Sequence, residues 1–365
     1  MERERQESEC PGFFYSLDSF RTTRMDLFTP IVPEEAWHPN FAAQILRPNP
    51  WNRAVLNNWA AGFVDRDGKF VQEFQTTFNS CFWELYLNAV LRERGFSVNF
   101  DFQSPDFVVS GQKPFTIEAA IASHAKGTLP EHRRAEAELP DDLNELNRQA
   151  IIRLSNALHA KHEKYKSYYA AMPHVTGKPF VVALAPFDRP HFNMSCQRAI
   201  EAFLYNYYVD EEEWISAGAR ESPVPKSLLF SVKKETGADI ELGVFQNGGM
   251  PEVSAVIFST CATWGKLRAL SADPNPNILF TALRLNPKGP IPHCINASKR
   301  EYKETLLDGL RVYHNPDANH PLDPATFRSP DVMQSYYSHD AEEWEHEQTE
   351  GQLLSRSVFT RERAG

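Results

Sequence analysis

The chain has 365 residues, 42% of them hydrophobic, and a formal net charge of −10. This length exceeds one average domain, so we expect one elaborated domain or two smaller ones. The acidic balance argues against a protein that coats nucleic acid by bulk electrostatics, although it leaves room for local phosphate contacts.

No run approaches the roughly 20 apolar residues of a membrane span, so no membrane association is expected. The polar stretch Met1–Glu7 has no apolar signal-peptide region. The cysteines are odd in number, widely scattered and never spaced as CxxC, which predicts reduced thiols in a cytoplasmic protein rather than a disulfide frame or a zinc knuckle. They are Cys10, Cys81, Cys196, Cys261 and Cys294.

The first 68 residues are rich in proline and tryptophan, and their prolines stand too close together for long helices. We expect residues 1–68 to form an irregular segment that packs onto the main body. Lys69–Gly95 then shows a helical pattern that is apolar almost all round, which predicts a helix buried on two sides. Gly95 is a natural stop for this helix.

A β-hairpin is predicted next along the chain. A short strand over Ser97–Phe102 precedes two apolar segments, Ser104–Val109 and Phe115–Ala120. Ser110–Pro114 contains glycine and proline and is the expected turn.

Each arm of this hairpin carries one acidic residue. If the hairpin closes symmetrically about Gln112, Asp106 and Glu118 lie opposite each other, since each is six positions from that centre. Directly paired residues have Cβ atoms about 4.5–5.5 Å apart. Two carboxylates this close repel unless a positive charge lies between them, and a divalent metal is the usual solution. A metal held in this way is suited to phosphodiester hydrolysis.

The following elements alternate between helices and strands. His124–Pro140 is charged and broken by glycine and proline, so we expect an exposed loop. A helix is predicted from Asp141 to about Tyr169, with the aspartate as its cap. Phe180–Ala185 and Val253–Phe258 are continuous apolar runs typical of strands buried on both faces, and Asn193–Tyr208 is predicted to be the helix between them.

This order of elements indicates an α/β fold with a mixed central sheet flanked by helices. Ser227–Val232 and Ile240–Phe245 are expected to form an inserted hairpin near residues 226–250. We therefore predict a core over residues 69–260, and a C-terminal extension with an acidic tail over residues 261–365.

The stretch Glu73–Phe187 resembles the restriction-endonuclease-like superfamily, whose signature is PD followed by (D/E)xK. Pro105 and Asp106 match the PD, Glu118 matches the second acid, and Glu84 matches an acid that many members carry on the preceding helix. The resemblance covers about a third of the chain. It implies a restriction-endonuclease-like core with N- and C-terminal elaborations, and a metal-dependent nuclease of a bacterial restriction or defence type.

The chain departs from this pattern at one position. The lysine of the signature belongs two residues after the second acid, and Ala120 stands there. Lys161, beside the apolar stripe of the long helix, is the candidate replacement, and such a migration is known in the family. Arg153 and Lys164 are candidates to hold phosphates of the substrate. The alternatives are that the Lys161 stem packs while its ammonium reaches water, and that Arg153 and Lys164 are solvated surface charges.

Each acid also has a structural explanation. Asp106 follows a proline, and an aspartate in that position is often a simple turn residue. Glu118 has small residues on its own strand face and is either exposed to solvent or a ligand. Glu84 lies on a largely apolar helix, where a structural hydrogen bond is as plausible as a metal contact.

The hypothesis is metal-assisted phosphodiester hydrolysis of nucleic acid, with DNA as the expected polymer. Asp106, Glu118 and the carbonyl of Ala119 would hold Mg²⁺ or Mn²⁺, with Glu84 reaching it directly or through water, while Lys161 stabilises developing charge. One alternative is a catalytically inactive protein of this fold that binds nucleic acid or another protein. Another is an unrelated α/β enzyme that resembles the family by coincidence.

Overall fold

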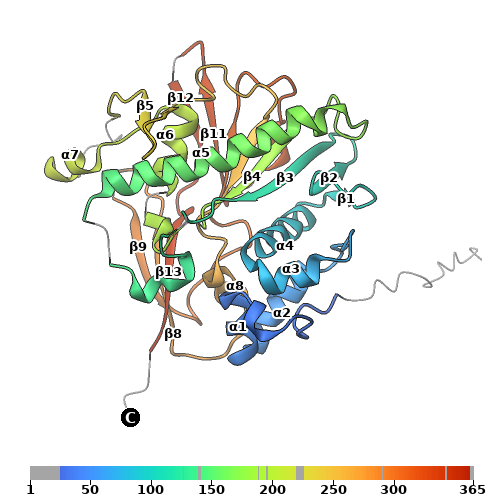
Figure 1. Cartoon of the computed structure of the whole chain (residues 1–365). Helices are drawn as coiled ribbons and strands as arrows, with labels where there is room; N and C mark the ends of the chain where they lie inside the picture. The colour runs from blue at the N-terminus through green and yellow to red at the C-terminus, as the bar shows by residue number, and fades with distance from the viewer. Residues whose placement is uncertain are drawn as a thin grey trace, which may run out of the picture.

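A computed structural model describes residues 25–361, except 126, 139–140, 188, 195, 219–225, 290 and 342. It is an α/β structure in which an eight-stranded mixed sheet is flanked by helices (Figure 1). The predicted α/β class, with a mixed central sheet flanked by helices, is thereby confirmed.

The main sheet has the strand order β1-β2-β3-β4-β7-β10-β11-β12. The pairs β3–β4, β4–β7 and β10–β11 are parallel and the other neighbours are antiparallel. The bounds are β1 Ser97–Asn99, β2 Phe107–Ser110, β3 Phe115–Ile121, β4 Phe180–Ala185, β7 Ala255–Phe258, β10 Leu310–His314, β11 Val332–Ser338 and β12 Glu343–Glu347.

Two smaller sheets accompany the main sheet. The first has the order β13-β8-β9, and the second pairs β5 with β6. Their bounds are β5 Ser231–Lys233, β6 Asp239–Glu241, β8 Ile278–Arg284, β9 His293–Ser298 and β13 Leu353–Thr360. The β5–β6 pair is the inserted hairpin expected near residues 226–250, with shorter strands than predicted.

The helices pack around the main sheet. The α-helices are α1 Pro39–Leu46, α2 Pro50–Trp59, α3 Phe70–Thr76, α4 Phe78–Glu93, α5 Leu143–Ser167, α6 Cys196–Tyr205, α7 Glu211–Ser216 and α8 Trp264–Leu270. The 3₁₀-helices are η1 Glu34–Ala36, η2 Glu131–Glu136, η3 Tyr169–Ala171, η4 Phe192–Met194 and η5 Pro324–Thr326. No described helix is long and apolar enough to cross a membrane.

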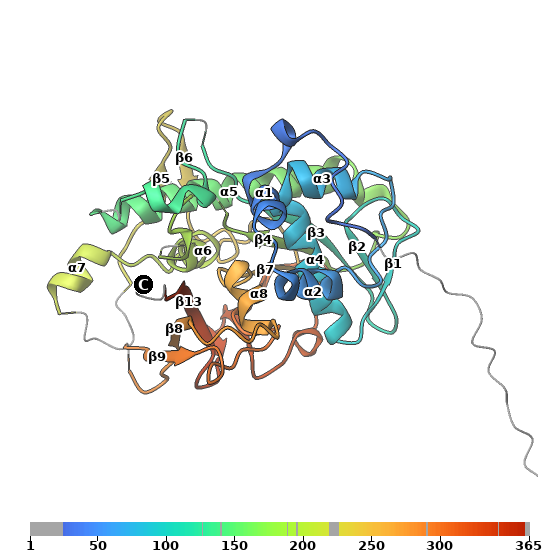
Figure 2. The same cartoon turned by 90° about the horizontal axis from the view of Figure 1, so that it is seen from below.

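The sheet separates two hydrophobic cores. On one face, α4 packs with Ile117 and Ala119 of β3. On the other face, α5 packs near Ala120 of β3 and near Ala122, which follows the strand. Side chains alternate between the faces of a strand, so β3 contributes to both cores. Figures 1 and 2 show α5 on one face of β3 and β4 and α4 on the other. Glu118 belongs to the face covered by α5.

The single helix predicted over Lys69–Gly95 is two helices, α3 and α4. The hydroxyl of Thr76 donates to the Gln72 carbonyl (3.1 Å), and that of Thr77 donates to the Glu73 carbonyl (3.0 Å). Thr77 itself leaves the helical region, with φ −129° and ψ 39°. Consecutive threonines that bond back to the preceding turn favour such a bend.

Gly95 ends α4 as predicted. Its φ of +75° allows the amide of Phe96 to donate to the Leu91 carbonyl (2.9 Å), and its own amide donates to the Arg92 carbonyl (2.9 Å). This pair of hydrogen bonds is the Schellman ending of a helix.

The segment expected to be irregular, residues 1–68, contains the short helices α1 and α2, which gather beside α4 (Figure 2). Pro39 and Pro50 occupy the first helical positions, where a missing N–H costs nothing. His38 and Asn49 cap the two helices with their side chains. The prolines therefore start short helices here. Residues 1–24 lie outside the described part.

The boundary expected near residue 260 does not divide the structure. β10, β11 and β12 continue the main sheet next to β7, so the C-terminal third completes the central sheet instead of forming an extension. β12 lies within the segment expected to be an acidic tail, and it is an edge strand paired with β11. The described thiols of Cys81, Cys261 and Cys294 are free.

Candidate active site

The hairpin of β2 and β3 closes in the predicted register. Phe107 pairs with Ile117 and Val109 with Phe115, so the next position outward places Asp106 opposite Glu118. Asp106 Oδ2 accepts a hydrogen bond from the amide of Ala119 (2.7 Å). The symmetry of the turn therefore brings the two acids together, as the sequence predicts.

The carboxylate of Glu118 is buried beneath α5 and held by three donors. Its Oε1 accepts from the ammonium groups of Lys161 (2.7 Å) and Lys164 (3.0 Å), and its Oε2 accepts from the hydroxyl of Tyr169 (2.9 Å). Glu118 is only 1% exposed. Burial raises the pKa of this carboxyl, but the two lysines outweigh it and leave the pKa below its ordinary value.

Lys161 lies beside the second acid, Glu118, where the replacement for the lysine of the signature is expected. It contacts Glu118 directly, and its charge also lowers the pKa of Asp106 against the larger effect of burial. Ala120, where the lysine of the signature would stand, packs in the core beneath α5 and is 8% exposed. A lysine there would have to displace α5, whereas Lys161 reaches Glu118 from that helix.

Asp106 and Glu84 lack the compensation that Glu118 has. Burial, together with the charge of Glu118, raises the pKa of Asp106 to about 6. Burial, together with the charge of Asp106, also raises the pKa of Glu84 well above its ordinary value. Within the described part of the chain, the Glu84 carboxylate forms no hydrogen bond or ion pair. These two acids therefore form an electrostatically unbalanced pair.

Both acids line a cleft of about 320 Å³. Lys164 also lines it, whereas Lys161 lies behind, on Glu118. The lining residues are Phe63, Val64, Asp65, Arg66, Asp67, Phe70, Glu73, Glu84, Gln103, Ser104, Asp106 and Lys164. The cleft thus lies between Asp106 of the hairpin, Glu84 of α4 and the segment between α2 and α3.

Arg66 and Tyr169 are site residues that the sequence did not assign. The guanidinium of Arg66 donates to the carbonyls of Phe102 (2.9 Å) and Pro105 (3.1 Å) and lies 3.9 Å from Asp106 Oδ1. It fixes the backbone that presents Asp106. Tyr169 was visible as part of the apolar stripe of α5, but no local pattern marks Arg66.

Arg153 is not part of this cluster. It lies eight residues before Lys161 on α5 and lines a separate pocket with Arg148 and Arg189. Of the predicted site residues, the structure brings Asp106, Glu118, Lys161, Lys164 and Glu84 together, and places Arg153 apart from them.

The residues of the cleft fit a divalent cation. Glu84 and Asp106 supply carboxylate oxygens, the ligands that Mg²⁺ prefers. A cation between them would offset the burial and the neighbouring negative charge that raise the pKa of both carboxyls. Among the described residues, the oxygens of Glu84, Asp106 and Glu118 do not all lie within 4.8 Å of one another. Glu84 and Asp106 are the two of these carboxylates that line the cleft, whereas Glu118 is held by two lysines.

A second polar cluster lies elsewhere in the described structure, where His38, Glu131 and His132 have atoms within 4.8 Å of one another. The Nδ1 atom of His38 accepts the amide of Asn40 (3.1 Å), which leaves the proton of the neutral ring on Nε2. The Oε1 atom of Glu131 already accepts the side-chain amides of Asn40 (3.2 Å) and Asn79 (2.7 Å). These atoms form a hydrogen-bond network and are poorly placed as a metal-ligand set.

Comparisons of the chain with protein-family models, curated proteins and solved structures gave no match.

We expect Asp106→Asn to be more stable than the wild type at neutral pH in the absence of metal. The pKa of Asp106 rises from 3.8 to about 6 on folding, which corresponds to as much as about 3 kcal/mol. Because the folded state holds this proton more tightly, wild-type stability falls as the pH rises from about 4 to about 6. The asparagine oxygen can still accept the Ala119 amide.

Denaturant unfolding in EDTA at several pH values measures this effect. The variant should be more stable at pH 7–8, and the difference should disappear near pH 4. Parallel pH profiles for the two proteins would contradict the electrostatic description of the site.

Proposed function

We propose that this protein is a metal-dependent nuclease that hydrolyses phosphodiester bonds. The observation that supports this most strongly is the ion-paired contact of Lys161 with Glu118, directly across the hairpin from Asp106. The acids, the cation and the order of elements correspond to the signature of the restriction-endonuclease-like superfamily, with the lysine moved from the strand to α5. We propose a nucleic acid, with DNA as the polymer, as the substrate, and the cytoplasm as the location.

Glu84 and Asp106 would hold Mg²⁺ or Mn²⁺ in the cleft. When bound, the ion supplies Lewis-acid polarisation of the phosphate and a lowered pKa of the attacking water. Arg66 holds the backbone carbonyls on either side of the cis Ser104–Pro105 bond and so keeps Asp106 aimed into the cleft. Glu118 fixes the ammonium groups of Lys161 and Lys164.

The two lysines have different roles in this proposal. Lys161 is the more enclosed, with 26% of its side chain exposed, and it stabilises the negative charge that develops on the phosphate. Lys164 lines the cleft and is 45% exposed, so it contacts the entering phosphate. The positive charges are thus arranged before the substrate arrives, as electrostatic catalysis requires.

One observation favours a second candidate function, an inactive protein of this fold that binds nucleic acid or another protein. Glu118 is fully satisfied by two lysines and a tyrosine, and such a site needs no metal to be stable. The net charge of −10 also favours a protein that does not use an extensive polynucleotide surface.

Metal titration separates the two functions. Mg²⁺ or Mn²⁺ should stabilise the wild type by about 2–3 kcal/mol at a hundredfold excess over Kd. Asp106→Asn and Glu84→Gln should lose this stabilisation because each removes a carboxylate of the cleft. Thermal unfolding and calorimetric titration measure it.

Glu131→Gln is the matched control, since it removes a carboxylate from the His38 cluster and should leave the stabilisation unchanged. An unaltered metal response in Asp106→Asn would reject the cleft as the metal site. A wild type without any response would favour the binding protein.

A further inference from the structure

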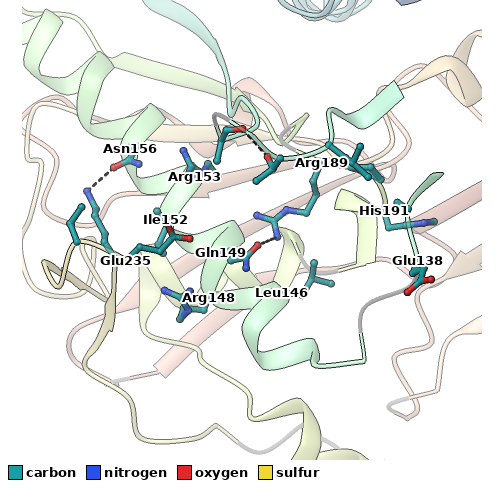
Figure 3. Close-up of a pocket in the computed structure, with 17 residues that line it drawn as sticks. Glu138, Leu146, Arg148, Gln149, Ile152, Arg153, Asn156, Arg189, His191 and Glu235 are labelled. Carbon is teal, nitrogen blue, oxygen red and sulfur yellow. Dashed lines mark hydrogen bonds between the residues drawn. The ribbon is translucent and has the colours of Figure 1, made fainter. Parts of the chain in front are cut away.

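A basic pocket lies along the N-terminal half of α5 (Figure 3). Its volume is about 590 Å³, and its walls are α5, the loops that follow β3 and β4, and the turn between β5 and β6. Four cationic side chains line it, against the two acids Glu138 and Glu235. The cations are Arg148, Arg153, Arg189 and Lys234.

The four cations of this pocket differ in how they are held. Arg148 is paired with Glu145 through two hydrogen bonds (2.6 and 2.7 Å). Lys234 donates to the neutral side chain of Asn156 (2.8 Å). Arg189 donates to the side chain of Gln149 (2.8 Å), as Figure 3 shows.

Arg153 has no such partner. Among the described residues, its guanidinium forms no hydrogen bond or ion pair, and it is only partly exposed. A guanidinium held in a pocket beside other cations favours an anion with several acceptor oxygens, because its planar donors match phosphate geometry.

The pocket and the candidate active site lie on the same side of α5. Arg153 and Lys164 are eleven residues apart, which at about 100° per residue leaves them about 20° from each other around the helix axis. Ala157 and Ala160 lie between them on this face, so no long side chain interrupts the path. Lys161 borders the same face. Cations therefore stand near both ends of one face of α5.

We propose that this pocket binds the phosphodiester backbone of the nucleic acid strand whose scissile phosphate lies at Asp106 and Lys164. This inference rests on the proposed function and adds a second anchoring point to it. Arg153 lies about 12–16 Å along the axis from Lys161 and Lys164, at 1.5 Å per residue. A strand that follows this face of α5 would therefore meet the protein at the cut and again a few nucleotides away from it.

The experiment uses the full chain and fluorescein-labelled oligonucleotides of 4, 8 and 16 nucleotides, single-stranded and duplex. Binding is measured by anisotropy in EDTA at several salt concentrations. Wild-type affinity should rise between 4 and 16 nucleotides. Arg153→Glu and Lys234→Glu should weaken binding of the 16-mers about three- to tenfold and lower the salt slope by about one. In both variants, affinity should therefore rise less between 4 and 16 nucleotides than it does in the wild type.

Lys288→Glu is the matched control, because it makes the same change in net charge on an exposed loop outside both pockets. The inference is overturned if Arg153→Glu and Lys234→Glu bind as Lys288→Glu does while the wild type cleaves DNA. If these two variants weaken binding but the wild type shows no metal-dependent cleavage, the result would support the pocket and reject the nuclease. A wild type that binds no oligonucleotide would reject both.

Discussion

Lys161→Ala should reduce phosphodiester cleavage by about 10²- to 10³-fold, the usual loss when one preorganised charge-stabilising donor is removed. Lys161 is the cation closest to Glu118, at 2.7 Å, and the lysine whose charge also reaches Asp106. The effect should fall on kcat, since the charge that Lys161 stabilises appears only in the transition state. Steady-state cleavage of a defined oligonucleotide measures it.

Lys164→Ala is the matched control for this prediction, because it removes an equal charge from the same carboxylate oxygen. It should raise KM more than it lowers kcat, since Lys164 lines the cleft and contacts the entering phosphate. Lys161→Arg should recover part of the lost rate. A larger kcat loss in Lys164→Ala than in Lys161→Ala would transfer the catalytic role to Lys164.

Glu118→Gln should abolish cleavage and also destabilise the fold by about 1–3 kcal/mol, because two ammonium groups lose the buried carboxylate that is their shared countercharge. Both lysines keep partial access to water, at 26% and 45% side-chain exposure, which keeps the cost moderate. Denaturant unfolding and cleavage assays on the same preparation measure both effects.

The opposite stability effects of the two acid variants distinguish this description of the site from a general loss of structure. Removing the charge of Glu118 should destabilise the protein, whereas Asp106→Asn should stabilise it at neutral pH. A Glu118→Gln variant as stable as the wild type would show that the lysines do not depend on that carboxylate.

The sequence was sufficient to predict the pairing of the acids. Symmetry about Gln112 and the period of two along a strand fix the register, and both are local properties. The contact between Lys161 and Glu118 spans 43 positions, yet the apolar stripe of α5 indicated which lysine borders the buried face.

Other parts of the site depend on tertiary packing that no local pattern encodes. Arg66 belongs to a segment without periodicity, and its contacts reach across the chain to Phe102 and Pro105. The imbalance of Glu84 arises from burial against Asp106. Neither could be read from residue type or spacing.

The prediction that residues 261–365 form an extension outside the core was wrong for a related reason. β10, β11 and β12 join the main sheet beside β7 through pairings between segments far apart in the chain. Gly309, at the start of β10, shows how closely these segments approach, since an added Cβ would lie 2.7 Å from Cys261 Cβ. Such contacts are set by the whole fold.

The most direct test of the proposed nuclease is cleavage of labelled DNA by the wild type and by Asp106→Asn, with Mg²⁺ or Mn²⁺ and with EDTA. The proposal predicts cleavage by the wild type only when metal is present, and none by the variant, which should remain folded. Metal-dependent cleavage retained by a pure Asp106→Asn preparation, or its absence from the wild type on single-stranded and duplex DNA alike, would contradict it.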